Sequence, residues 1–224
     1  LGFTETIPDY LLADSEIEEI TVPDTIKNLG TGAFFLCTAL KKAKLPSAIT
    51  EIPDNTFYTC RKLESITIPN TVKEIGDYAF YECNNLLTVT GGSKLEKIGS
   101  YVFKYCTKLK DITLPSSIKE VGSSIFDECI SLKTAGPTSG NYNIKLGFTE
   151  TIPGYLFADS EIEEITIPDT IKNLGTGAFS LCTALKKAKL PSAITEIPDN
   201  TFYTCRSLES IAIPSAVKKI GDYA

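Results

Sequence analysis

Seven cysteines recur along the chain at a fixed interval. Five of them are each 23 residues apart, and two more repeat that interval further on: Cys37, Cys60, Cys83, Cys106 and Cys129, then Cys182 and Cys205. A phenylalanine precedes each of these cysteines by three residues: Phe34, Phe57, Phe80, Phe103, Phe126, Phe179 and Phe202. A constant period of this length is typical of a repeat protein in which every repeat forms one coil that stacks on the next.

A second, longer period lies above the first. Residues 146–224 copy residues 1–79 with only nine substitutions, which indicates a recent duplication. The spacing from Cys129 to Cys182 is 53 residues, which fits one enlarged repeat with a turn-rich insertion loop at about 134–148. We therefore predict one continuous solenoid over residues 1–224, made of a first super-repeat, 1–145, and a partial second one, 146–224. We also expect the parent chain to continue beyond residue 224 in the same pattern.

Each repeat contains a short strand and a compact turn. Ile66 and Ile68 alternate with polar residues, so this stretch predicts a strand with one buried face. Proline ends the strand because it has no N–H for a sheet ladder, and it does so in almost every repeat: Pro23, Pro46, Pro69, Pro115, Pro168, Pro191 and Pro214. Ala79, Phe80 and Cys83 have helical or 3₁₀ spacing, so we predict a single helical turn there.

One coil cannot fold alone. Its few inward apolar side chains do not offset the conformational entropy of ordering 23 residues, so neighbouring coils must share their core. We predict that eight phenylalanines form one buried stack along the array: Phe34, Phe57, Phe80, Phe103, Phe126, Phe157, Phe179 and Phe202.

The repeat from Leu63, Leu-x-x-Ile-x-Ile-Pro-x-x-Val-x-x-Ile-Gly-x-x-Ala-Phe-x-x-Cys, resembles the BspA-like leucine-rich repeat. The resemblance implies an α/β repeat solenoid: a right-handed leucine-rich-repeat superhelix with a parallel sheet on the concave side and short helical or 3₁₀ turns on the convex side. It also implies an extracellular or cell-surface microbial protein, often concerned with adhesion to host proteins.

The strand alternation places a second set of side chains outward. If Ile66 and Ile68 face the core, Ser65 and Thr67 face solvent, and the period carries this pattern to every coil. The predicted outward residues form a candidate binding face: Glu19, Thr21, Lys42, Lys44, Ser65, Thr67, Thr88, Thr90, Asp111, Thr113, Glu164, Thr166, Lys187 and Lys189. The threonines either serve strand propensity alone or form, with the two lysine pairs, a strip that binds a partner carrying acidic groups.

Two other residue classes have alternative interpretations. A 23-residue spacing does not suit zinc, whose ligands pair two to four residues apart, so the cysteines predict a buried column of free thiols, although an oxidising compartment leaves disulfides open. Exposed tyrosines near the predicted turn either pack between coils or anchor a partner: Tyr58, Tyr78, Tyr81, Tyr101, Tyr105, Tyr155 and Tyr203.

Composition excludes several functions. The chain has no histidine, which removes the usual general base and every histidine metal site, and it has no phosphate-binding loop or nucleophile elbow. Glu16, Glu18 and Glu19 lack the spacing of a calcium loop. The net charge of −6 disfavours nucleic acid, and no apolar run is long enough to span a bilayer. We predict no enzymatic activity, no cofactor and no metal.

Binding is the leading hypothesis for function. On this view the protein engages another protein or a polysaccharide, including host matrix proteins, through its repeated outward face. The alternative is a structural stalk that displays another domain, for which a duplicated block would adjust length. An ice-binding threonine ladder is a third hypothesis, which the lysine pairs weaken because they interrupt the ladder.

Overall fold

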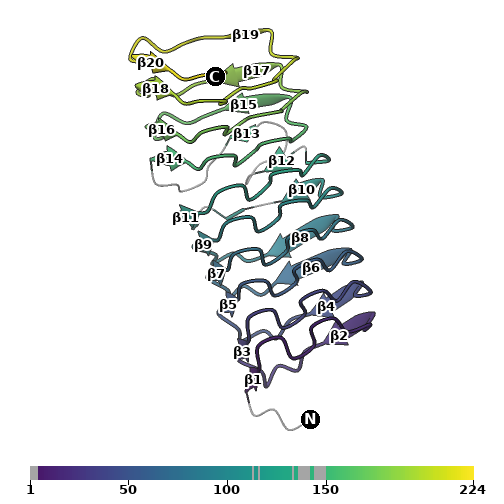
Figure 1. Ribbon diagram of the computed structural model, residues 1–224. Helices are drawn as coiled ribbons and strands as arrows, with labels where there is room; N and C mark the ends of the chain where they lie inside the picture. Colours follow the sequence, from purple (N-terminus) through teal and green to yellow (C-terminus); the bar gives the residue numbers. More distant parts are fainter. Residues whose placement is uncertain (1–4, 113, 116, 133, 136–141, 144–149) are drawn as a thin grey trace.

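The chain forms a solenoid of stacked coils (Figure 1). Equivalent strands of neighbouring coils begin about 23 residues apart in the sequence. The computed structural model describes residues 5–112, 114–115, 117–132, 134–135, 142–143 and 150–224. Two columns of short parallel strands run along the stack, and β1 (Thr6–Ile7) and β20 (Lys219–Ile220) lie near its opposite ends (Figure 1). The architecture confirms the predicted leucine-rich-repeat solenoid with parallel strands.

One column contains a six-stranded and a four-stranded parallel sheet. The six-stranded sheet consists of β2 (Glu19–Thr21), β4 (Lys42–Lys44), β6 (Ser65–Ile68), β8 (Thr88–Gly91), β10 (Asp111–Ile112) and β12 (Thr134–Ala135). The four-stranded sheet consists of β13 (Tyr142–Asn143), β15 (Glu164–Thr166), β17 (Lys187–Lys189) and β19 (Ser210–Ile211). In each pair of neighbouring strands, a residue lies opposite the equivalent residue of the next repeat. Ser65, for example, lies opposite Thr88.

The other column is built from two-residue strands. They are β1 (Thr6–Ile7), β3 (Asn28–Leu29), β5 (Glu51–Ile52), β7 (Glu74–Ile75), β9 (Lys97–Ile98), β11 (Glu120–Val121), β14 (Thr151–Ile152), β16 (Asn173–Leu174), β18 (Glu196–Ile197) and β20 (Lys219–Ile220). Their pairing is also parallel, in sheets of two or four strands.

The core is the predicted stack of phenylalanines. Eight rings from Phe34 to Phe202 lie one above another, and the centroids of neighbouring rings are 5.1–6.2 Å apart. All are fully buried except Phe202, which is partly buried. The longest step, 6.2 Å, joins Phe126 to Phe157 across the enlarged repeat. The core is therefore continuous between the two copies.

The strand register is confirmed as well. In β6, Ile66 and Ile68 are buried, whereas Ser65 and Thr67 are exposed. The strand ends directly before Pro69, as the missing proline N–H predicts. The alternation of apolar and polar residues is therefore sufficient to orient the sheet.

The predicted helical turn is wrong. No helix occurs among the described residues, and the segment around Phe80 consists of hydrogen-bonded turns instead. Two of its residues, Tyr78 and Glu82, have positive φ angles of 56°, which interrupts any right-handed helix. The same two left-handed positions recur in the other coils.

Hydrogen bonds between coils explain this geometry. Tyr78, Phe80 and Glu82 each donate a backbone N–H to a carbonyl of the following coil. The residues between them include Tyr81, which donates back to Tyr78 three residues earlier within its own coil. A helix would use its N–H groups for hydrogen bonds within the segment, whereas here alternate N–H groups donate to the next coil. Neighbouring coils are therefore joined by hydrogen bonds at the turns as well as at the strands.

The predicted insertion loop at 134–148 contains two short strands. β12 pairs with β10 on one side and β13 with β15 on the other, both in parallel. The rest of that segment, 136–141 and 144–148, lies outside the described residues.

Glycine is required where successive coils approach most closely. A Cβ on Gly76 would lie 2.2 Å from Oδ1 of Asp54 and 2.5 Å from its backbone nitrogen. That carboxylate also accepts the N–H of Asp77 at 2.7 Å, so the acidic side chain ties one coil to the next. A glycine follows β3, β7, β9, β11, β16 and β20 in the same way, and at Gly76 it leaves room for this contact.

Candidate functional site

The outward side chains of β2, β4, β6, β8, β15, β17 and β19 form one exposed surface, which we call the strand face. The structure places twelve of the fourteen predicted site residues on it, and all twelve are exposed: Glu19, Thr21, Lys42, Lys44, Ser65, Thr67, Thr88, Thr90, Glu164, Thr166, Lys187 and Lys189. Asp111 lies in β10, without a described side chain, and Thr113 lies outside the described residues.

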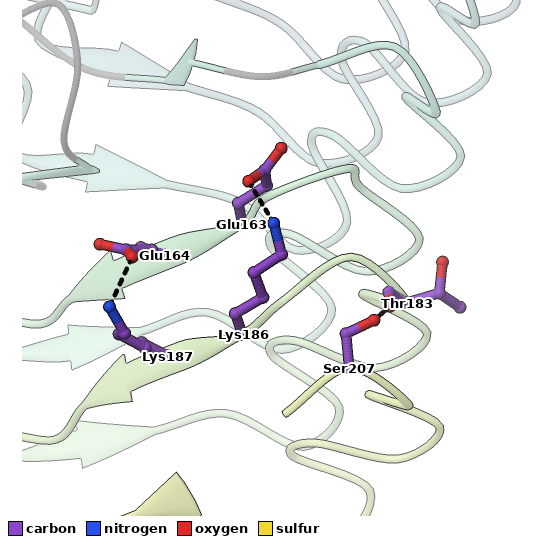
Figure 2. A network of polar contacts seen from close by, with 6 residues as sticks. All are labelled: Glu163, Glu164, Thr183, Lys186, Lys187 and Ser207. Atoms are coloured by element: carbon purple, nitrogen blue, oxygen red, sulfur yellow. Dashed lines mark hydrogen bonds and ion pairs between the residues drawn. The ribbon is translucent and has the colours of Figure 1, made fainter. Parts of the chain in front are cut away.

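Lysine–glutamate pairs tie neighbouring coils together on and beside this face. The ammonium of Lys42 is 3.0 Å from a carboxylate oxygen of Glu19, and the equivalent distance from Lys187 to Glu164 is 3.1 Å. Figure 2 shows the second pair beside Lys186 and Glu163, which are 2.8 Å apart. These pairs are exposed to solvent, so they add little to stability and mainly fix where the charges stand.

Strands β4 and β17 each carry a second outward lysine that forms no such ion pair with a described residue. Lys44 and Lys189 are exposed, and within the described part of the chain neither has a carboxylate within ion-pair distance. The reason is the register: Thr21 lies opposite Lys44 in the adjacent strand, whereas Glu19 lies opposite Lys42. Each copy of the duplicated block therefore presents one lysine whose charge is available to a partner.

Both free lysines line hollows of the strand face. The first lysine hollow measures about 350 Å³ and is lined by β2, β4 and β6: Glu19, Ile20, Thr21, Lys42, Ala43, Lys44, Ser65 and Thr67. The second lysine hollow measures about 560 Å³ and includes every counterpart of that set: Glu164, Ile165, Thr166, Lys187, Ala188, Lys189, Ser210 and Ala212. Long lysine stems beside short hydroxyl and methyl side chains account for the concavity.

Sequence reasoning missed part of this site. Ala43 and Ala188 stand at the core-facing strand position where Ile66 has a larger side chain, and both line the hollows. Ser47 and Ser192, beyond the strands, line the same region of the face. The alanines are visible in the sequence as departures from the repeat, so that signal could have located the hollows.

Local carboxylates beside the hollows are engaged by the backbone. Asp24 accepts the N–H of Ser47 at 2.8 Å. This hydrogen bond lowers the pKa of Asp24, with smaller contributions from the Ser47 hydroxyl and the nearby charge of Lys44. Asp169 and Ser192 repeat the arrangement in the second copy at 2.7 Å. Asp24 thus remains ionised and holds in place the loop that contains Ser47, which follows β4.

The tyrosines of the first copy, Tyr58, Tyr78, Tyr81, Tyr101 and Tyr105, pack between coils, whereas Tyr155 and Tyr203 are exposed. The ring of Tyr58 stacks between those of Phe35 and Tyr81, with centroid distances of 4.9 and 4.8 Å. Tyr78 stacks on Tyr101 in the same way, at 4.9 Å. Because the faces of these rings cover one another, mainly ring edges remain for a partner, which supports the packing interpretation. Ser180 replaces Phe35 in the second copy, where Tyr203 lacks this stacked neighbour.

The cysteines form the predicted column of free thiols, and all are buried except Cys205, which is partly exposed. Sequence reasoning treated them as small apolar groups, but each thiol also donates a hydrogen bond. Cys83 donates to the carbonyl of Phe57 in the preceding coil at 3.2 Å, and Cys106 does the same to Phe80. Burial raises the pKa of the Cys60, Cys83, Cys106 and Cys129 thiols, and it raises the pKa to about 11 for Cys182 and about 12 for Cys205.

We expect these thiols to be inert in the folded protein. The thiolate is the reactive form, so a raised pKa combined with burial suppresses alkylation near neutral pH. N-Ethylmaleimide followed by mass spectrometry should label none of the six buried cysteines under native conditions, with Cys205 the first to react. After denaturation without a reductant all seven should be labelled. A lower count would demonstrate disulfides.

Among the described residues, no group of three or more Cys, Asp or Glu side chains is placed to hold a metal ion. Glu18 and Glu19, weighed as calcium ligands, pair with Lys41 and Lys42 instead. In the part of the chain that the structure describes, no helix is long and apolar enough to span a membrane.

The comparisons with known proteins give the same fold. The BspA-type leucine-rich-repeat region matches in six copies over residues 5–133 and 148–224. A leucine-rich-repeat protein from Bacteroides ovatus is 27% identical, with a TM-score of 0.77, over 97% of this chain. This chain spans 60% of that protein's length. A comparison with curated protein sequences found no match.

Two further solved structures share the fold. A leucine-rich cell-surface protein from Faecalibacterium prausnitzii is 24% identical, with a TM-score of 0.60, over 96% of this chain and 72% of its own. The pneumococcal vaccine antigen PcpA is 22% identical, with a TM-score of 0.57, over 97% of this chain and 65% of its own.

The stacked coils, the parallel strand columns and the exposed strand face define a leucine-rich-repeat solenoid, a fold that typically serves as a non-enzymatic scaffold for protein interactions. The chain belongs to the BspA-type leucine-rich-repeat family.

Proposed function

We propose that this chain is the binding part of a cell-surface or secreted protein that adheres to another macromolecule, a protein or a glycan, through its strand face. The observation that carries the proposal is the pair of lysine hollows, each with a lysine free of ion pairs among the described residues. Two structural relatives, a cell-surface protein from Faecalibacterium prausnitzii and a pneumococcal vaccine antigen, support an extracellular location.

The rigidity of the fold suits this role. Outward residues of successive coils are held at a fixed register by the strand pairing and by the phenylalanine stack, so little order is lost when a ligand binds. An extended, preorganised surface of this kind recognises an extended partner better than a small molecule. We propose no catalytic activity for it.

A stalk is the second candidate. The near-copy of residues 1–79 and the continuous ring stack from Phe126 to Phe157 would lengthen a rigid rod that displays another domain. On this hypothesis substitutions on the strand face do not impair function. The binding experiment below therefore separates a stalk from a binding module.

We expect that filling both hollows weakens adhesion strongly. Thr21→Phe together with Thr166→Phe adds bulk to each hollow without changing charge, so it blocks a protein or a glycan alike. Against a panel of extracellular matrix proteins and polysaccharides, measured by biolayer interferometry, affinity for the bound ligand should fall at least about tenfold.

The matched control lies on the other strand column. Thr6→Phe with Thr151→Phe changes the equivalent exposed residues of β1 and β14, also one per copy, and should leave affinity unchanged. Equal losses in both variants, or no ligand in the panel, would contradict binding through the strand face and favour the stalk.

A further inference from the structure

We propose that the two lysine hollows act together as one bivalent site for an anionic polysaccharide, a sugar polymer that carries carboxylate or sulfate groups at regular intervals. The inference rests on the proposed binding function of the strand face and names the ligand class for it.

The chemistry of each hollow suits a charged sugar. Lys44, which has no ion pair among the described residues, lines the first hollow together with the hydroxyl-bearing Thr21, Ser65 and Thr67. An ammonium donates charge-assisted hydrogen bonds to carboxylate or sulfate, and the hydroxyls both donate to and accept from sugar hydroxyls. The carboxylate in this hollow, Glu19, is already paired with Lys42, so its repulsion of an anion is largely compensated.

The second hollow contains a near-copy of the first and extends beyond it along Leu190, Ser192, Ile213 and Pro214. Of the eight residues that line the first hollow, only Thr67 differs in the second copy, where Ala212 replaces it. A ligand that fits one hollow therefore fits the other in the same orientation, because the strands of both copies run parallel within one solenoid.

Their separation favours a polymer. Phe34 and Phe179 belong to the two coils that carry Lys44 and Lys189. Six ring-to-ring contacts separate these two phenylalanines along the stack. At the usual spacing of parallel strands this places the hollows roughly 30 Å apart. A polymer with repeated anions offers the same group at both places, whereas a folded protein would need a duplicated site of its own. Occupying both hollows with one chain raises affinity through effective concentration.

The composition of the face also argues against a folded acidic protein as the occupant. Protein interfaces depend on buried aromatic, arginine and large apolar anchors. The outward residues of β2, β4, β6 and β8 are instead threonine, serine, lysine and glutamate. A surface of hydroxyls with isolated cations matches a hydrated, hydroxyl-rich polymer better.

The test uses the full chain, immobilised sparsely, and four soluble polymers. Hyaluronan supplies carboxylates, dextran sulfate supplies sulfates, dextran is the neutral control and polyglutamate is the acidic-polypeptide control. We expect hyaluronan or dextran sulfate to bind, with affinity that falls as salt rises, and dextran not to bind. The arm that binds identifies carboxylate or sulfate as the recognised group.

Substitutions then test bivalency. Lys44→Ala or Lys189→Ala alone should weaken binding of the long polymer by about 10–100-fold through loss of avidity, and the double variant should bind no better than dextran. A tetrasaccharide of the same polymer, too short to reach both hollows, should bind weakly and respond to each single substitution by no more than about twofold. The matched control, Lys73→Ala with Lys218→Ala, removes two exposed lysines at equivalent places outside the hollows and should change affinity less than twofold.

Several results would overturn the inference. If neither anionic polysaccharide binds, or if Lys73→Ala with Lys218→Ala costs as much as the double hollow variant, the site is not as proposed. If polyglutamate binds as tightly as the polysaccharides, the ligand class is wrong although the strand face still binds. The effect of Thr21→Phe with Thr166→Phe on the matrix panel is independent of ligand charge, so it judges the proposed function separately.

Discussion

Replacing Phe80 by alanine should lower the free energy of unfolding by about 3–5 kcal/mol. The Phe80 ring is fully buried and stacks between Phe57 and Phe103, with centroid distances of 5.3 and 5.4 Å. Its loss leaves a cavity that two rigid neighbouring coils cannot close, because both are tied together by turn and strand hydrogen bonds. Urea denaturation followed by circular dichroism measures the change.

A ring of the same type in a looser place provides the control. Phe202 is only partly buried and has one stacked neighbour in the described stack, Phe179, at 5.5 Å. Phe202→Ala should therefore cost clearly less than Phe80→Ala, since less surface is removed from its packed environment. Equal losses for the two variants would mean that the stack is not the source of the stability of the array.

The core could be predicted from the sequence because burial and periodicity coincide. Phe80 and Cys83 recur every 23 residues, and a residue that recurs at one place in every coil occupies the same place in the stack. The alternation of Ile66 and Ile68 with polar neighbours likewise determines which side of the strand is inward. Both predictions needed only the pattern.

The turn could not be predicted from spacing alone. Ala79, Phe80 and Cys83 have the same separations in a helical turn and in the stacked turns of this structure, so periodicity does not distinguish them. The difference arises from N–H groups that donate to the next coil, which is a tertiary effect. A local signal exists, because Gly32 and Asn55 occupy the left-handed position that Tyr78 takes in its own coil.

The candidate site was half predictable. The outward residues follow from the strand register, but the availability of a lysine depends on the side chain opposite it in the adjacent coil. The sequence contains that information at the 23-residue offset: Glu19 precedes Lys42, whereas Thr21 precedes Lys44. The hollows themselves depend on how long and short side chains stand beside one another, which only the folded structure reveals.

Replacing Ile66 by aspartate should be the most damaging single change on a strand, with a loss of more than about 4 kcal/mol in the free energy of unfolding. The Ile66 side chain is 2% exposed and packs in the continuous core. A carboxylate there has no charged partner among inward residues such as Val89 and Leu63, so it must either lose its hydration or take up a proton. Thermal denaturation at pH 7 should show the loss, and protonation at pH 4 should recover part of it.

The adjacent residue makes the test specific for the register. Thr67→Asp places the same carboxylate one residue further along β6, where the side chain is exposed, and should change the free energy of unfolding by less than about 0.5 kcal/mol. Both variants have the same net charge. They differ in the face of the strand on which the aspartate lies. Because a shift of one residue would exchange the two faces, a stable Ile66→Asp together with an unfolded Thr67→Asp would reverse the sheet and remove the strand face as a binding surface.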